Sequence, residues 1–171
     1  WRAARRKVSP DIIRLEADLR VAIEKNQFQL YYQPQVDLET GRLTGTEALI
    51  RWQRPDRADS SELHTVSPVD FIPVAEESGL IIPIGHWVLK EACRQAKLWQ
   101  EEGYPPVTMS VNVSVMQLQQ QDLVEQIQEV LDETGLAAEW LELEITESVV
   151  ADDFERITVV LEKLKALGIH M

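Results

Sequence analysis

The chain has 171 residues, 44% of them hydrophobic, which suffices for one sizeable core. Its formal net charge of −12 argues against nonspecific binding to nucleic acid polymers or anionic membranes, because an acidic surface repels phosphate. A nucleotide ligand would need cations between its phosphates and the carboxylates of the protein. The composition therefore indicates Mg²⁺ or Mn²⁺ if the ligand carries phosphate.

The cysteine count and the hydropathy of the chain indicate its cellular compartment. A single cysteine, Cys93, rules out an internal disulfide and fits a reducing compartment, and its helical spacing from apolar residues predicts a buried thiol. No apolar run approaches the ~20 residues needed to cross a bilayer, and no secretory signal is present. We expect a cytoplasmic segment without direct membrane contact, in a parent protein that is free to carry a membrane anchor.

The first ten residues differ in composition from the rest of the chain. The chain begins at Trp1 and carries a basic run over residues 2–7, which we interpret as a linker from an upstream domain; a nucleic-acid-binding arm is the competing interpretation. Ser9 and Pro10 are typical of a helix start. The expected domain organisation is therefore a linker over 1–10 and a folded domain over 11–171.

The remaining pattern alternates between strands and helices. Strands are expected from residue 28 to a hairpin turn at 36–43, then over 43–52, 108–115 and 141–145, with a polar loop over 53–65. Helices are expected to end at four glycines, Gly79, Gly103, Gly135 and Gly168, the last three helices starting near residues 84, 117 and 152. Such alternation predicts βα units and a mainly parallel sheet. Residues 169–171 look like the start of another strand, so the fold is unfinished where the chain ends.

Polar residues line one face of three predicted strands. Successive side chains of a strand point to opposite faces. Glu47 therefore lies on the face opposite Ala48 in the first strand, Asn112 opposite Val111 in the second, and Glu144 opposite its apolar neighbours in the third. If the strands form a parallel barrel, their apolar faces meet the helices and these three side chains point inward. The alternative is that each is a solvated or salt-bridged residue of an open antiparallel sheet.

Two carboxylates and a carboxamide supply oxygen ligands of the kind that hard divalent cations prefer. Buried charge is costly unless it is paired or binds a metal, and barrel active sites lie at the carboxyl ends of strands. The pattern therefore predicts a metal site made by Glu47, Asn112 and Glu144.

Six blocks stand out in order along the chain: Tyr31–Pro34 with Val36-Asp37, Glu47–Trp52, Ser67-Pro68 with Phe71–Pro73 and Ala75–Glu77, Pro83–Gly85, Ser110–Ser114 and Leu143–Ser148. Together they resemble the N-terminal part of the EAL-domain cyclic di-GMP phosphodiesterase family. The resemblance implies an α/β fold, a TIM-type (β/α)8 barrel whose first strand runs antiparallel to the rest, truncated here before its later strands.

The resemblance also implies residue roles. Glu47, Asn112 and Glu144 occupy metal-ligand positions, in agreement with the strand faces. The catalytic positions are Glu47, Glu144 and Glu147, the last of which steadies a loop at the site.

Substrate contacts follow from the same resemblance. Gln33 occupies a position at the substrate site, and Leu49 and Arg51 line the nucleotide pocket. A guanidinium at Arg51 also suits a bidentate phosphate contact on chemical grounds.

The implied reaction is hydrolysis of cyclic di-GMP to the linear dinucleotide pGpG with two Mg²⁺ or Mn²⁺ ions, in bacterial second-messenger signalling by the complete domain. The implied partners are cyclic di-GMP, an upstream sensory or GGDEF-type domain and a second copy in a homodimer. The segment alone is expected to be inactive, because the family's remaining ligands follow Met171.

One alternative is a degenerate domain that binds cyclic di-GMP or a protein partner without hydrolysis; an unrelated metal-dependent barrel is another.

Two groups of polar residues are not expected to bind metal. Asp152-Asp153 resembles the family's later Asp-Asp ligand pair, but it comes too soon after Glu144 and opens a predicted helix, where acidic residues suit the dipole. His64, His86 and His170 show no ligand spacing and are expected at the surface.

Overall fold

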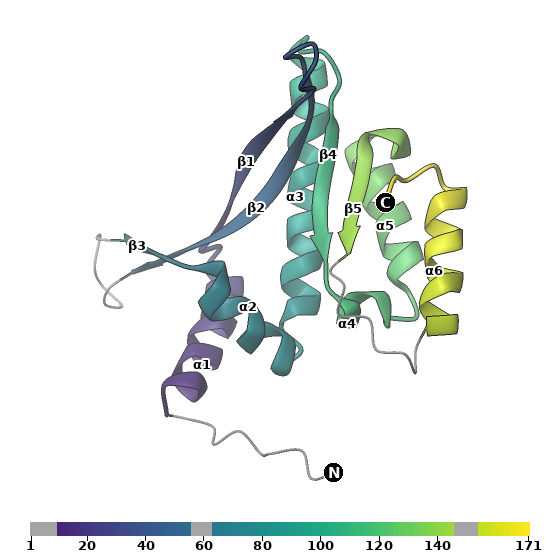
Figure 1. The fold of residues 1–171 in the computed structure, drawn as a ribbon. Helices are drawn as coiled ribbons and strands as arrows, with labels where there is room; N and C mark the ends of the chain where they lie inside the picture. Colours follow the sequence, from purple (N-terminus) through teal and green to yellow (C-terminus); the bar gives the residue numbers. More distant parts are fainter. Residues whose placement is uncertain (1–9, 56–62, 146–153) are drawn as a thin grey trace. The chain divides into compact units, whose positions relative to one another are not determined.

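A computed structural model describes residues 10–55, 63–145 and 154–171. Its elements in chain order are α1 (Pro10–Glu24), β1 (Phe28–Val36), β2 (Leu43–Pro55), β3 (Leu63–Val66), α2 (Pro68–Glu77), α3 (Ile81–Glu101), β4 (Thr108–Val113), α4 (Val115–Leu118), α5 (Leu123–Thr134), the 3₁₀ helix η1 (Ala138–Trp140), β5 (Leu141–Ile145) and α6 (Phe154–Ala166) (Figure 1). Two compact units result: a first unit of 1–29 with 51–80, and a second unit of 30–50 with 81–171.

A sheet of order β1-β2-β4-β5 connects these elements, and β3 pairs with the far end of β2. β1 and β2 form a hairpin closed by a hydrogen bond from the Asp37 amide to the Arg42 carbonyl, 2.9 Å long, so these neighbouring strands run antiparallel. β2 with β4, and β4 with β5, are parallel. The expected mainly parallel sheet with an antiparallel first strand is confirmed.

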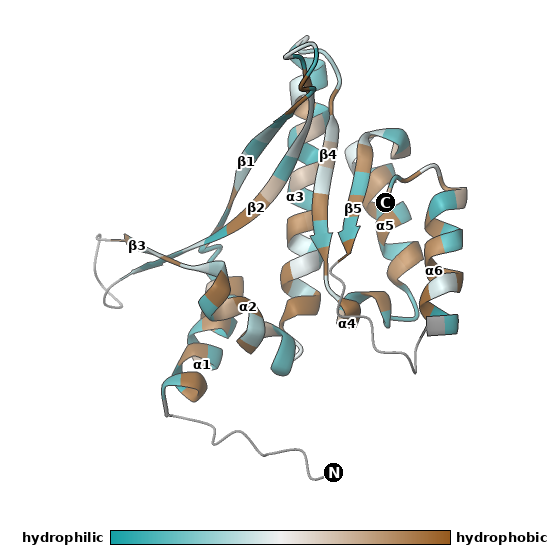
Figure 2. Ribbon diagram, viewed as in Figure 1, coloured by the Kyte–Doolittle hydropathy of each residue, from teal (hydrophilic) through white to brown (hydrophobic). Residues whose placement is uncertain are grey.

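Helices of the second unit cover the apolar face of β4 and β5. Met109, Val111 and Leu143 are almost completely buried, and α3 packs on β4 while α5 packs on α3. Figure 2 shows hydrophobic and hydrophilic residues alternating along β5. Parallel strands need a crossover between them, and the α3 and α4–α5 segments supply it. The sheet therefore buries one face and leaves the other available to polar groups.

The last residues extend this pattern. The His170 amide donates to the Leu141 carbonyl at 3.0 Å, and the Leu143 amide donates to the His170 carbonyl at 2.9 Å. His170 thus makes a parallel bridge with Glu142. The structure thus has a single bridge residue beside β5 at the place where the sequence predicts the start of another strand.

An aromatic cluster forms the core of the first unit. The Phe71 ring lies 5.7 Å from that of Trp52 and 6.1 Å from that of Phe28, measured between centroids. The Trp52 indole donates a hydrogen bond of 3.2 Å to the Gln27 side chain, so its polar atom is satisfied. Phe71 and Trp52 have no exposed surface, so this cluster is fully inside the unit.

Several expected boundaries are wrong. The stretch expected as a loop over 53–65 is partly strand, because β2 continues to Pro55 and pairs antiparallel with β3. The Thr65 hydroxyl donates to the Gln53 side chain at 3.1 Å, which shows how polar residues can stabilise such a pair. Helix α3 begins at Ile81 and contains Pro83 in its first turn, where the missing amide has no partner to lose.

The strand expected over 108–115 ends at Val113, and the helix expected from residue 117 is two helices, α4 and α5. Ser114 is the cause, since its side chain caps α4 and turns the chain. The four glycines expected to end helices all have positive φ and follow α2, α3, α5 and α6. Cys93 is fully buried, as expected, and this burial raises the pKa of the thiol to about 12.

The three histidines are exposed, as expected. Within the described ranges, none of the helices combines the length and the hydropathy that a membrane span requires. Asp152 and Asp153 lie outside the described residues.

Candidate metal and nucleotide site

Three neighbouring strands bring Glu47, Asn112 and Glu144 to one face of the second unit. In the parallel register Glu47 is opposite Ser110, and Asn112 is opposite Glu144. Ser110 and Asn112 are two residues apart on β4 and therefore share a face. Their partners Glu47 and Glu144 lie on that same side of the sheet. The Asn112 amide donates to Glu47 Oε1 at 2.8 Å, across 65 positions of sequence. The structure thus brings together the three residues that the strand pattern singles out.

Two carboxylates of this group affect one another. Burial raises the pKa of the Glu144 carboxyl above its usual range, and the negative charge of Glu47 raises it further. Hydrogen bonding from Ser110 lowers this pKa, and so does hydrogen bonding from Gln35, while the charge of Glu142 raises it. The ionised form of Glu144 is therefore destabilised by a like charge nearby, and a cation between the two carboxylates would relieve this repulsion.

The donor set suits a hard cation. Glu47 and Glu144 offer carboxylate oxygens and Asn112 offers a carboxamide oxygen, as Mg²⁺ and Mn²⁺ prefer. In residues 10–55, 63–145 and 154–171, no group of three or more His, Cys, Asp or Glu side chains is arranged to hold a metal. The described part of the candidate site offers two carboxylates and an amide, which would leave coordination positions for water or a ligand.

The end of β4 is held by the turn that follows Asn112. The Ser114 hydroxyl accepts from the Gln117 amide at 3.3 Å, and the Gln117 side chain accepts from the Ser114 amide at 3.1 Å, a capping box that starts α4. The Gln117 side chain lies against Gly85 of α3, where any added Cβ would overlap it. Gly85 thus gives Gln117 its space, and this packing fixes the turn two residues beyond Asn112.

Of the predicted substrate contacts, two lie in the same unit as this site. Gln33 is exposed on β1, and Leu49 is half-buried on β2 and shares the strand face of Glu47. Arg51 is half-buried near the far end of β2, in the first unit. Glu147 lies outside the described residues.

Sequence reasoning missed one member of this polar group. The side chain of Gln35, on β1, lowers the pKa of the Glu144 carboxyl. The available signal was its spacing, two residues after Gln33 and hence on the same strand face. Ser110, a member of the predicted polar face, is completely buried, and its hydroxyl donates to Glu142 Oε2 at 2.9 Å.

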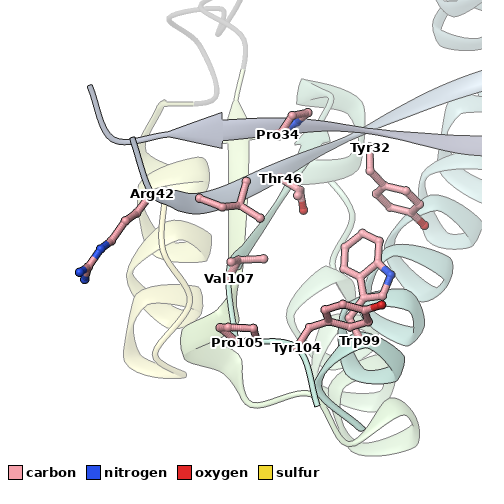
Figure 3. A pocket seen from close by; sticks show the side chains of 9 residues that line it. Tyr32, Pro34, Arg42, Thr46, Trp99, Tyr104, Pro105 and Val107 are labelled. Carbon is pink, nitrogen blue, oxygen red and sulfur yellow. The ribbon is translucent and has the colours of Figure 1, made fainter. Parts of the chain in front are cut away.

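A cavity of about 760 Å³ in the second unit lies elsewhere. Figure 3 shows the rings of Tyr32, Trp99 and Tyr104 gathered on one side of it, with the Arg42 side chain pointing away from them. Thr46 lines this cavity, and as the neighbour of Glu47 it points to the opposite face of β2. The cavity is largely apolar and has no carboxylate in its lining, so it is separate from the candidate metal site.

Known proteins resemble this chain in sequence. The family model described as the EAL domain matches residues 16–171, almost the whole chain. The chain belongs to the EAL domain family. The signaling protein YkoW of Bacillus subtilis is 42% identical over 156 residues, which are 91% of this chain and 19% of that protein. The bifunctional diguanylate cyclase/cyclic di-GMP phosphodiesterase MucR of Pseudomonas aeruginosa is 40% identical over 157 residues, which are 92% of this chain and 22% of that protein.

Solved EAL structures share this fold. A structure described as the PaMucR phosphodiesterase in complex with c-di-GMP matches with a TM-score of 0.83 and 40% identity, over 91% of this chain and 61% of that one. The FimX EAL domain of Xanthomonas citri in complex with c-di-GMP matches with a TM-score of 0.77 and 27% identity, over 93% of this chain and 59% of that one. The expected α/β fold of EAL type is confirmed, and the chain spans about three-fifths of these solved chains.

Proposed function

We propose that the full-length protein hydrolyses cyclic di-GMP to the linear dinucleotide pGpG with divalent cations. The observation that supports this most directly is the contact between Asn112 and Glu47 beside Glu144, on one sheet face of an EAL domain. A relative described as a phosphodiesterase and solved with c-di-GMP has the same fold at 40% identity.

Glu47, Asn112 and Glu144 would hold the metal in this proposal, and Mg²⁺ or Mn²⁺ bound there would polarise the phosphoryl oxygens and lower the pKa of a water. The sheet carries the two carboxylates on β2 and β5, the parallel strands on either side of β4, so it would preorganise the proposed site. The resemblance adds Glu147 as a residue that steadies a loop at the site.

Substrate recognition is assigned to Gln33, Leu49 and Arg51. Leu49 offers apolar surface beside Glu47 on β2, which suits a nucleobase, and the Arg51 guanidinium suits phosphate. With a net charge of −12, the protein would repel a dianionic ligand without bound cations. The acidic balance therefore supports a role for metal in binding as well as in hydrolysis.

The same proposal covers the protein's organisation. The start of the family match at residue 16 supports a domain beginning near residue 11, with 1–10 as a linker. MucR is described as a bifunctional cyclase and phosphodiesterase, which supports a GGDEF-type partner domain. A cytoplasmic homodimer completes the proposal.

The second candidate is a domain that binds cyclic di-GMP without hydrolysing it. The solved FimX domain, described as an EAL domain in complex with c-di-GMP, supports this alternative. Either function uses the same nucleotide, so only turnover separates them.

Purified full-length protein is expected to convert cyclic di-GMP to the linear dinucleotide in Mn²⁺ or Mg²⁺, and to lose this activity in EDTA. Product formation followed by reverse-phase chromatography measures it. Binding of cyclic di-GMP without product in either metal would contradict hydrolysis and favour the receptor. Absence of both binding and turnover would contradict both candidates.

A further inference from the structure

Gly85 lies inside helix α3, where glycine is unfavourable. It is buried, and its helical backbone imposes no need for glycine. Glycine destabilises the interior of a helix relative to alanine, so the missing side chain needs another reason. A Cβ at this position would lie 2.1 Å from Nε2, 2.5 Å from Cδ and 2.8 Å from Oε1 of Gln117. The Gln117 amide therefore fills the space that the side chain of any other residue would take.

The same amide holds the chain just after β4. Gln117 Oε1 accepts hydrogen bonds from the Ser114 backbone amide at 3.1 Å and from the Ser114 hydroxyl at 3.2 Å. The Ser114 hydroxyl in turn accepts from the Gln117 backbone amide at 3.3 Å, which closes the capping box. Gln117 is only 7% exposed, so water has little access to replace these bonds. A displaced Gln117 side chain would therefore release Ser114.

Asn112 lies next to this anchor, at the point where β4 leaves one of its two neighbours. The pairing of β4 with β2 ends at Val111, whereas its pairing with β5 continues to Val113. The anchor at Ser114 follows directly. The Asn112 side chain is exposed, and its position depends on the backbone that carries it and on its contact with Glu47 at 2.8 Å. A shift of the turn after β4 would therefore move the Asn112 amide relative to Glu47.

We propose that Gln117 is a positioning residue for Asn112, and that Gly85 has no side chain so that Gln117 can hold the turn after β4. The consequence for metal affinity rests on the proposed function, because Asn112 is a metal ligand only there. Residues that support a metal ligand typically change affinity or activity by about 10–100-fold when they are removed. Gln117 acts through the backbone at Ser114, so its effect is expected near the lower limit of this range.

Three variants of the full-length protein test this role. Gln117→Ala removes the amide, Gly85→Ala keeps the amide and displaces it, and the third variant combines both. Each single substitution is expected to weaken Mn²⁺ binding, measured by isothermal titration calorimetry, by about 10-fold. Gly85→Ala raises the helix propensity of α3, so its loss of affinity would not come from a weakened helix.

The double variant separates a shared cause from two independent ones. It is expected to bind Mn²⁺ as tightly as Gln117→Ala does, because the methyl group added at position 85 then has no amide to displace. Losses that multiply to about 100-fold in the double variant would show that the two positions act independently, and would overturn the inference.

The matched control is Gln120→Ala, three residues further along the same segment. Gln120 is half-buried and its amide donates to the Met116 carbonyl at 3.3 Å, so the variant removes an amide that holds a different backbone group. The control is expected to leave Mn²⁺ affinity at the wild-type value. A loss as large as that of Gln117→Ala would contradict the inference, since any disturbance of this segment would then be sufficient.

A crystal structure of metal-free Gln117→Ala supplies a second readout, in which the Asn112 amide is expected to lose its hydrogen bond to Glu47. If that contact remains at its wild-type distance, the inference is overturned whatever the affinity. Unchanged Mn²⁺ affinity in Gln117→Ala, when the wild type binds Mn²⁺, overturns it as well. A wild type that binds no Mn²⁺ contradicts the proposed function, and the contact between Asn112 and Glu47 still decides the role of Gln117.

Discussion

Replacing Glu47 by alanine is expected to reduce turnover of cyclic di-GMP by more than about 100-fold, because groups that only support a metal ligand already contribute about 10–100-fold. The variant removes one carboxylate and leaves Asn112 without the acceptor that it contacts at 2.8 Å. Turnover of the purified full-length variant in Mn²⁺, compared with wild type, measures the effect.

The matched control for this variant is Glu129→Ala, which removes an exposed glutamate from α5. It changes the net charge by the same amount as Glu47→Ala. A difference in turnover between the two variants therefore reports the position of the lost glutamate and not the change in charge. Control turnover is expected to equal that of the wild type. Near-normal turnover of Glu47→Ala would refute its role as a metal ligand.

Replacing Phe71 by alanine is expected to cost about 3–5 kcal/mol of folding free energy, the usual range for a buried aromatic residue. Phe71 has no exposed surface and its ring packs against Trp52 and Phe28. Its removal leaves a cavity between two large rings that cannot collapse without moving the strands that carry them. Urea denaturation followed by circular dichroism measures the loss.

Val69→Ala provides the comparison within the same helix. Val69 is 82% exposed on α2, and surface substitutions of this kind usually change stability by less than about 0.5 kcal/mol. A loss for Phe71→Ala no larger than that for Val69→Ala would show that the aromatic cluster does not stabilise the first unit.

The strand faces could be predicted from the sequence because a buried strand encodes its orientation in every second residue. Val111 and Leu143 are buried, and Asn112 and Glu144 share the other face, as alternation predicts. Parallel pairing followed from the strand-helix alternation. Together these rules were enough to group Asn112 with Glu144 and Glu47 from the sequence alone.

The ends of elements and the long side-chain contacts could not be predicted in this way. Alternation alone extends β4 to Val115, but the capping box of Ser114 and Gln117 starts a helix there. The Gln35 side chain lies where a Cβ at Gly45 would overlap it, and this could not be predicted because a glycine in a strand has several possible causes. These features arise from three-dimensional contacts between strands distant in sequence.

The most direct test of the metal site is anomalous diffraction from crystals of the full-length protein containing Mn²⁺. A peak is expected within ~2.3 Å of carboxylate oxygens of Glu47 and Glu144 and of the Asn112 side-chain oxygen, the range for hard divalent cations with oxygen ligands. A peak at this face in the wild type and none in Glu47→Ala would confirm the site. Mn²⁺ bound only elsewhere, or no bound Mn²⁺ in a protein that turns over cyclic di-GMP, would contradict it.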